Sequence, residues 1–243
     1  MSSRSSKSRQ QLQSTVLAIS GLLLLVALYI GVQLFRSGLA AYQARSFLDD
    51  WQANGVIPSE RAWNVAFEAA RSSVSQYPLL DNGEYLDNLG RVYEWQYFQS
   101  PFGDSLAEPS RRSALEAYRA AIGSRPLWPH TYGQLAYIKV RLLEFDGEFA
   151  QAYRQAFELG PWRPLVLEQL SEIALIAWPS LTSEQRKQGL ETFRRTYEMD
   201  RQAARRLHEL AESAGLLPQF CLALPLRSTK PSKGFCSAFV PSP

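Results

Sequence analysis

The sequence predicts an all-α protein in which one apolar N-terminal helix precedes a row of helical hairpins. Three observations favour this fold: a long uncharged run near the N-terminus, amphipathic patterns separated by prolines, and a spacing motif that recurs along the chain. No stretch alternates polar and apolar residues as a strand does. The 243 residues are 46% hydrophobic and 12% aromatic, which is enough for a packed core and excludes a disordered linker.

The N-terminal run has the length and composition of a membrane span. From Val16 to Phe35 no side chain is charged and almost all are apolar. About 20 helical residues cross the hydrocarbon core of a bilayer, so 14–36 is predicted to be a transmembrane helix. A secretory signal peptide has a similar charge pattern, and residues 38–40 resemble a cleavage site. Signal peptides have shorter apolar regions, which favours an uncleaved anchor.

The basic residues around the span predict its orientation. Arg4, Lys7 and Arg9 precede it, whereas Arg36 and Arg45 follow it. This bias favours a cytoplasmic N-terminus and a periplasmic C-terminal domain in a bacterial inner membrane. The three residues before the span account for the whole formal net charge of +3. The exported part is therefore neutral overall, and we expect no nucleic-acid partner.

After the span, amphipathic patterns predict a series of helices that end near prolines. Ser59, Ser110 and Thr182 are predicted helix starts. The C-terminal tail is rich in proline and poor in apolar anchors, so irregular structure is expected there. The helices are predicted at 37–54, 59–76, 82–99, 110–124, 129–144, 147–158, 164–177, 182–199 and 201–214. The predicted division is a basic cytoplasmic tail at 1–13, the span at 14–36, a helical repeat domain at 37–216 and an irregular tail at 217–243.

The helices after the span repeat one spacing motif. Small residues let two helices approach closely, and a large residue between them fills the remaining gap. The clearest copies lie 35 residues apart, and a third begins at Ala66. The two copies read Ala114, Tyr118, Ala121, Pro126 and Phe149, Tyr153, Ala156, Pro161.

This pattern resembles the tetratricopeptide repeat over residues 59–201. The resemblance implies helix pairs stacked in a row, whose first helices form a concave face. A face with mixed charge and aromatic rings suits a peptide or helix of a partner protein. By register, the predicted partner-binding residues are Asp87, Arg91, Trp95, His130, Tyr137, Arg141, Glu168 and Glu172.

The residues give no indication of an enzyme. The histidines, His130 and His208, have no carboxylate or cysteine at ligand spacing, and no phosphate-binding loop motif occurs. We therefore expect no catalytic residue, no metal and no cofactor. A catalytic pair of carboxylates is the alternative, since Glu84, Asp87 and Glu94 can share a helix face. Such residues more often form an ordinary solvated face.

Two further features each have two interpretations. Cys221 and Cys236 are predicted to form a disulfide in an oxidising periplasm, and two free cysteines are the alternative. Trp128 and Trp162 each lie in a turn between two prolines. A rigid hairpin with the ring packed over the junction is predicted for each turn, and an exposed aromatic surface for a partner or a sugar is the alternative.

A basic surface near the C-terminus also has two interpretations. Acidic residues alternate with the basic ones, so a solvated face of ion pairs is predicted. Binding of anionic lipid or an acidic polymer is the alternative. The basic residues are Arg186, Lys187, Arg194, Arg195, Arg201, Arg205 and Arg206.

The turns and the helices beside them carry a narrower resemblance. Four short stretches and one lysine resemble the VpsP-type polysaccharide biosynthesis family. They are Tyr93–Trp95, Tyr118–Ile122, Arg125–Pro129, Leu159–Trp162 and Lys139. Its members are single-span, periplasm-facing helical-repeat proteins linked to exopolysaccharide synthesis and export. The resemblance implies a scaffold for such a complex, with other envelope proteins as partners. A scaffold for secretion or pilus assembly, or a direct glycan-binding module, is the alternative.

Overall fold

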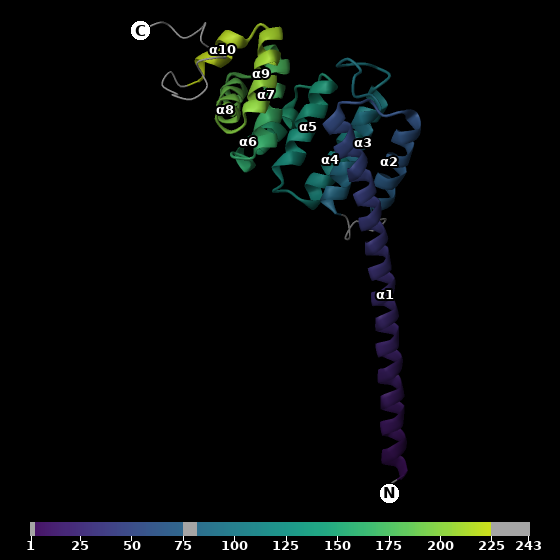
Figure 1. The fold of residues 1–243 in the computed structure, drawn as a ribbon. Helices are drawn as coiled ribbons and strands as arrows, with labels where there is room; N and C mark the ends of the chain where they lie inside the picture. Colours follow the sequence, from purple (N-terminus) through teal and green to yellow (C-terminus); the bar gives the residue numbers. More distant parts are fainter. Residues whose placement is uncertain (1–2, 75–81, 225–243) are drawn as a thin grey trace.

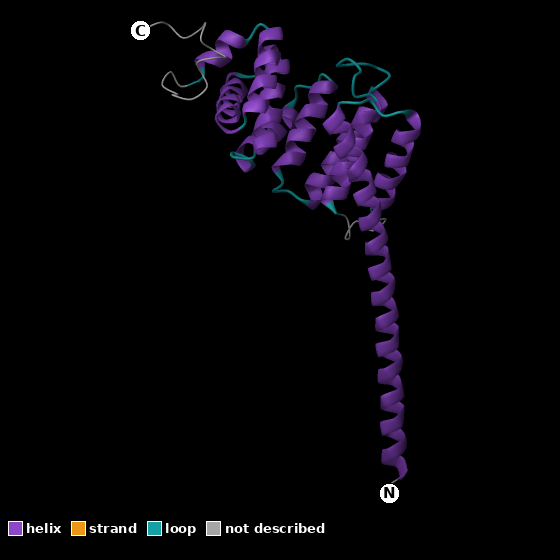
Figure 2. Cartoon of the chain, viewed as in Figure 1, coloured by secondary structure: helices purple, strands orange, loops and turns teal. Residues whose placement is uncertain are grey.

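The computed structural model describes residues 3–74 and 82–224, and within these ranges every regular element is helical (Figures 1 and 2). This confirms the predicted all-α fold with an apolar N-terminal helix. The elements are α1 Ser3–Asn54, α2 Glu60–Ser73, α3 Gly83–Gln96, α4 Glu108–Ser124, α5 Pro129–Arg141, α6 Gly147–Leu159, α7 Pro164–Ala177, the short 3₁₀ helix η2 Trp178–Ser180, α8 Ser183–Met199, α9 Arg201–Ser213 and α10 Leu217–Leu222.

α1 is one uninterrupted helix that begins near the N-terminus and ends inside the folded body (Figure 1). The side chains from Val16 to Phe35 are exposed, and α1 contains a segment with a mean hydropathy of 2.5. α1 is therefore long and apolar enough to cross a membrane. The helix predicted at 37–54 is the direct continuation of this segment. α1 ends at Asn54, and the residue that follows, Gly55, has a φ of 62° that suits glycine.

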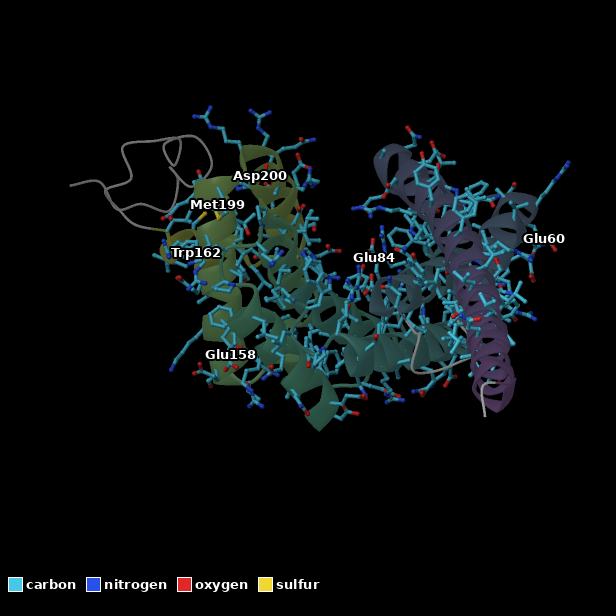
Figure 3. The ribbon with its side chains drawn as sticks, turned by 90° about the horizontal axis from the view of Figure 1, so that it is seen from below. Glu60, Glu84, Glu158, Trp162, Met199 and Asp200 are labelled. Atoms are coloured by element: carbon cyan, nitrogen blue, oxygen red, sulfur yellow. The ribbon has the colours of Figure 1, made fainter. Side chains whose placement is uncertain are left out.

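After the apolar segment the helices pair as hairpins: α1 with α2, α3 with α4, α5 with α6, and α7 with α8. The first helices of the first two pairs run in the same direction. Arg45 on α1 donates to Glu84 at the start of α3 at 2.9 Å, and Arg91 further along α3 donates to Gln52 of α1 at 2.9 Å. The hairpins form a curved row with α1 at one end (Figures 1 and 3).

The recurring small and large residues lie where helices touch. Gly90 of α3 faces the ring of Tyr118 on α4, and a Cβ at Gly90 would lie only 2.5 Å from that ring. Tyr153, which occupies the matching position in the next copy, is fully buried and donates to the carbonyl oxygen of Leu170 at 3.2 Å. The contact between Gly90 and Tyr118 follows the predicted packing rule within one hairpin, whereas Tyr153 bonds to α7 of the next hairpin.

Two of the three predicted helix starts are confirmed. The hydroxyls of Ser59 and Thr182 each accept a hydrogen bond from a backbone N–H in the first turn of the helix that follows. Ser110 was the wrong choice, because α4 already begins at Glu108. The Ser110 hydroxyl instead donates to the carbonyl oxygen of Tyr93 at 2.7 Å, which links α4 to α3.

Two buried arginines fix the long connection between α3 and α4. Arg111 donates to the carbonyl oxygen of Ser100 at 2.9 Å, and Arg141 donates to that of Tyr97 at 3.0 Å. α3 ends at Gln96 and not at residue 99 as predicted, and the carbonyl oxygens that follow it accept hydrogen bonds from these side chains. The two side chains thus compensate for the loss of helical hydrogen bonds in this connection.

The first residues of the predicted irregular tail are helical. α10 packs on α9, and Phe220 is fully buried with its ring 5.2 Å from Trp178 and 5.0 Å from Phe193. Pro218 lies in the first turn of α10, where its missing N–H breaks no helical hydrogen bond. The predicted boundary at 217 was therefore too early, and residues 225–243 lie outside the described part of the chain.

The structure describes one of the two cysteines of the predicted disulfide. Cys221 is buried on α10 and is disulfide-bonded. Cys236, its predicted partner, lies outside the described residues.

Candidate functional site: the inner face

We use the term inner face for the surface of α3, α5 and α7 on the inside of the curved row. In a view along α1, Glu84 of α3 lies between the two arms of the curve, whereas Glu60 and Trp162 lie on its outer sides (Figure 3). All the residues predicted to bind a partner belong to these helices: Asp87, Arg91 and Trp95 to α3, His130, Tyr137 and Arg141 to α5, and Glu168 and Glu172 to α7.

Hydrogen bonds between side chains join the helices of the inner face. The hydroxyl of Thr131 on α5 donates to Asp87 on α3 at 2.8 Å. The hydroxyl of Tyr137 on α5 donates to Glu172 on α7 at 3.3 Å. These two separate bonds therefore join α5 to α3 through Asp87 and to α7 through Glu172.

Two predicted partner-binding residues lie in the interior instead. Trp95 is buried, with its ring stacked on Phe98 at 4.4 Å and tilted against the ring of Trp51 at 5.8 Å. Arg141 is also buried, and its guanidinium is used by the carbonyl oxygens of the α3–α4 connection. Both residues stabilise the body, so their side chains are not presented to a partner.

The other predicted residues are half-buried, and neighbouring helices fix several of them. Glu168 accepts from Arg206 of α9 at 2.6 Å. Burial lowers the pKa of His130, and the positive charges of Arg163 and Arg125 lower it further. His130 is therefore neutral at pH 7 and can both donate and accept a hydrogen bond.

Glu94 is a buried acid behind the inner face. Its side chain accepts from the Tyr118 hydroxyl at 2.7 Å, and the residue is only 8% exposed. Burial raises the pKa of Glu94 to about 7, although the bond from Tyr118 and the charge of Arg141 act in the opposite direction. Burial also raises the pKa of Asp87 and of Glu172. The solvated face favoured for Glu94 from the sequence was therefore wrong.

Replacing Glu94 with glutamine is expected to stabilise the protein by about 2–3 kcal/mol at about pH 8 and to change little at about pH 4. The folded pKa of about 7 exceeds the ordinary value of 4.5, so the wild-type protein loses stability as the pH rises through 7. Glutamine does not ionise and still accepts from Tyr118. Urea unfolding of the detergent-solubilised chain, followed by tryptophan fluorescence, measures the difference.

The exposed Glu158→Gln is the matched control for this experiment, and its effect is expected to be within about 0.5 kcal/mol at both pH values. A difference for Glu94→Gln that is equal at the two pH values would contradict a raised pKa.

The two turn tryptophans differ in exposure. The half-buried ring of Trp128 has the guanidinium carbons of Arg125 and Arg163 at 5.1 and 4.8 Å from its centroid. Trp162 is 63% exposed, with Arg195 at 4.9 Å from its ring. Trp128 thus fits the predicted ring packed over the junction between two helices. The exposed ring of Trp162 fits the alternative, an aromatic surface for a partner or a sugar.

The basic surface near the C-terminus carries the ion pairs that its alternating charges predict. On α8, Glu191 pairs with both Arg194 and Arg195 at 2.7 Å. On α9, Arg206 pairs with Glu168 of α7. The prediction of an ion-paired face is confirmed for Arg194 and Arg195, whereas Arg206 pairs with an acid outside the alternating stretch.

Among the described residues, no group of three or more histidine, cysteine, aspartate or glutamate side chains could hold a metal ion. No protein-family model and no curated protein matches the sequence. The resemblances to tetratricopeptide repeats and to the VpsP-type family therefore stay predictions.

Proposed function

We propose that the protein is a membrane-anchored adaptor whose inner face binds a peptide or helix of another membrane protein. The observation that carries this proposal is the row of half-buried polar and ionisable groups on α3, α5 and α7, in which Arg91 lies among acids and several groups are held by hydrogen bonds between helices. Fixed donors and acceptors of both charges favour one complementary partner over others. The anchor adds to this selection, because a shared membrane raises the effective concentration of the partner.

We place the hairpins in the periplasm of a bacterium and the partner in a machine that makes or exports an exopolysaccharide. The excess of basic residues before the apolar segment supports this orientation. The disulfide-bonded state of Cys221 also supports an oxidising compartment. The resemblance to the VpsP-type family supports the choice of machine.

Photo-crosslinking in intact membranes tests the proposal. A photoreactive residue in place of His130 or Glu168 is expected to capture the same partner, whereas one in place of the exposed Glu60 on the outer side is expected to capture none (Figure 3). The charge reversal Arg91→Glu is expected to reduce capture at position 168 several-fold, because Arg91 contributes positive charge to the inner face.

The identity of the captured protein separates the parts of the proposal. A glycosyltransferase, polymerase or export channel would support the polysaccharide machine. Secretion or pilus components would replace that machine while leaving the adaptor in place. Equal capture at positions 60 and 168 would contradict a binding role for the inner face.

A further inference from the structure

The hairpins begin immediately above the apolar segment of α1. The apolar run ends at Phe35, and Ala41 is the first residue of α1 buried against the other helices. At 1.5 Å per residue this rise is about 9 Å, similar to the depth of the head-group layer. A helix without a break in this interval keeps the hairpins close to the membrane surface.

The turns between hairpins lie at the end of the body from which this segment leaves. A Cβ at Gly38 of α1 would lie 3.7 Å from the hydroxyl of Tyr85 at the start of α3. The neighbouring Gly83 packs on the side chain of Arg125 at the end of α4. Figure 1 shows the α4–α5 turn on this side of the body.

The contacts continue from this turn to the next one. Gly160, at the end of α6, packs on Pro129, and the guanidinium of Arg163 lies over the ring of Trp128. The α4–α5 and α6–α7 turns are therefore adjacent along one edge. We call this edge the span-side edge and define it by Arg125, Leu127, Trp128, Trp162, Arg163 and Leu165.

The span-side edge combines exposed apolar side chains with arginines. Leu127 is 77% exposed and Trp162 is 63% exposed, and Leu165 is exposed beside them. Arg125 and Arg163 flank Trp128. Tryptophan prefers the head-group layer of a bilayer, and arginine binds phosphate with two parallel hydrogen bonds. Glu158, near the end of α6, is the exposed acid closest in sequence to these turns.

We propose that the span-side edge rests on the head-group layer and binds the phosphates of anionic phospholipids. Leu127, Trp162 and Leu165 enter the layer, while Arg125 and Arg163 contact the phosphates. The hairpins then contact the membrane surface directly and are not held to it by α1 alone. This inference uses only the membrane span of the proposed function and is independent of any protein partner.

Two leucines of nearly equal exposure provide a matched test. Leu127 is on the span-side edge, whereas Leu106, 76% exposed, is in the α3–α4 connection at the opposite end of the hairpins. A fluorescent amino acid replaces one or the other in the full chain. The proteins are reconstituted into vesicles of phosphatidylcholine, with or without about a third of phosphatidylglycerol. A lipid with a spin label on its head group serves as the quencher.

Quenching at position 127 is expected to exceed that at position 106 several-fold, and to increase when phosphatidylglycerol is present. The double substitution Arg125→Gln and Arg163→Gln is expected to remove that increase, because the phosphate contacts are lost. Far-UV circular dichroism establishes that each protein is folded. Retention in vesicles after an alkaline wash establishes the span separately from the edge contact.

Equal quenching at positions 127 and 106 in proteins that keep the span would overturn the proposal. A signal at position 127 that ignores the lipid quencher but responds to an added acidic oligosaccharide would also overturn it. In that case the edge binds glycan, the alternative that the exposed Trp162 also allows.

Discussion

Replacing Lys139 with methionine is expected to lower the free energy of unfolding by about 3 kcal/mol at pH 7. The Lys139 side chain is only 2% exposed, and its ammonium pairs with Asp146 at 2.7 Å, Glu148 at 2.8 Å and Glu144 at 3.2 Å. Methionine fills a similar volume but leaves three carboxylates close together without their shared cation. Denaturant unfolding of the detergent-solubilised chain measures the loss.

Lys187→Met is the matched control, because Lys187 pairs with Glu184 on an exposed helix surface at 3.8 Å. Its effect is expected to be within about 0.5 kcal/mol. Equal losses for the two variants would show that burial adds nothing to the value of the Lys139 pairs.

The loss caused by Lys139→Met is expected to shrink in acid. Hydrogen bonds from Arg119 and Lys139 lower the pKa of Glu148 to about 2. The pKa of Asp146 and of Glu144 is also lowered, since bonds to cations outweigh the opposing effect of burial. Groups with a lowered folded pKa contribute stability above their ordinary value of about 4 and lose it as the pH falls toward 2. A loss that stays constant down to pH 2 would show that Lys139 acts only through packing.

The second large effect is expected at Gly189, where α8 meets α7. A Cβ at this position would overlap the Cβ of Ala174 and lie 3.2 Å from the hydroxyl of Tyr153. The Cβ of Ala174 cannot rotate away, so α7 and α8 have to separate. Gly189→Ala is expected to lower the free energy of unfolding by about 2 kcal/mol. Urea unfolding followed by tryptophan fluorescence measures the change.

Gly123→Ala serves as the control because it makes the same change on the exposed surface of α4, where a Cβ meets nothing within 4 Å. Alanine favours a helix over glycine, so this variant is expected to gain up to about 1 kcal/mol. The two substitutions therefore have opposite expected signs. Stabilisation by both would show that the α7–α8 contact relaxes without cost.

Much of the fold could be predicted because its signals are local in sequence. The 35-residue spacing relates Tyr118 to Tyr153, and both of these side chains are fully buried. The uncharged run from Val16 to Phe35 likewise identifies the apolar segment of α1 by itself. Helical periodicity also placed the inner-face residues on α3, α5 and α7, because the register of a helix decides which side chains share a face.

The buried polar groups could not be predicted, since their partners are distant in sequence. Arg111 is a charged residue in a polar stretch, and only folding brings it to the carbonyl oxygen of Arg141, 30 residues later. Glu94 is similar, because its burial depends on Tyr118 from the next helix. The sequence gives one usable signal for Lys139, namely the acids at 144, 146 and 148 that follow it closely.

The continuity of α1 has a mechanical consequence. Each residue of an α-helix adds 1.5 Å of height and about 100° of rotation. In the proposed membrane-anchored arrangement, the few residues between Phe35 and Ala41 therefore set both the distance of the inner face from the bilayer and the direction in which the inner face points. A partner helix that tilts or rotates α1 within the membrane would therefore move the whole row of hairpins. The segment between Phe35 and Ala41 thus acts as a rigid spacer. Its length in residues determines which partner proteins the inner face can reach.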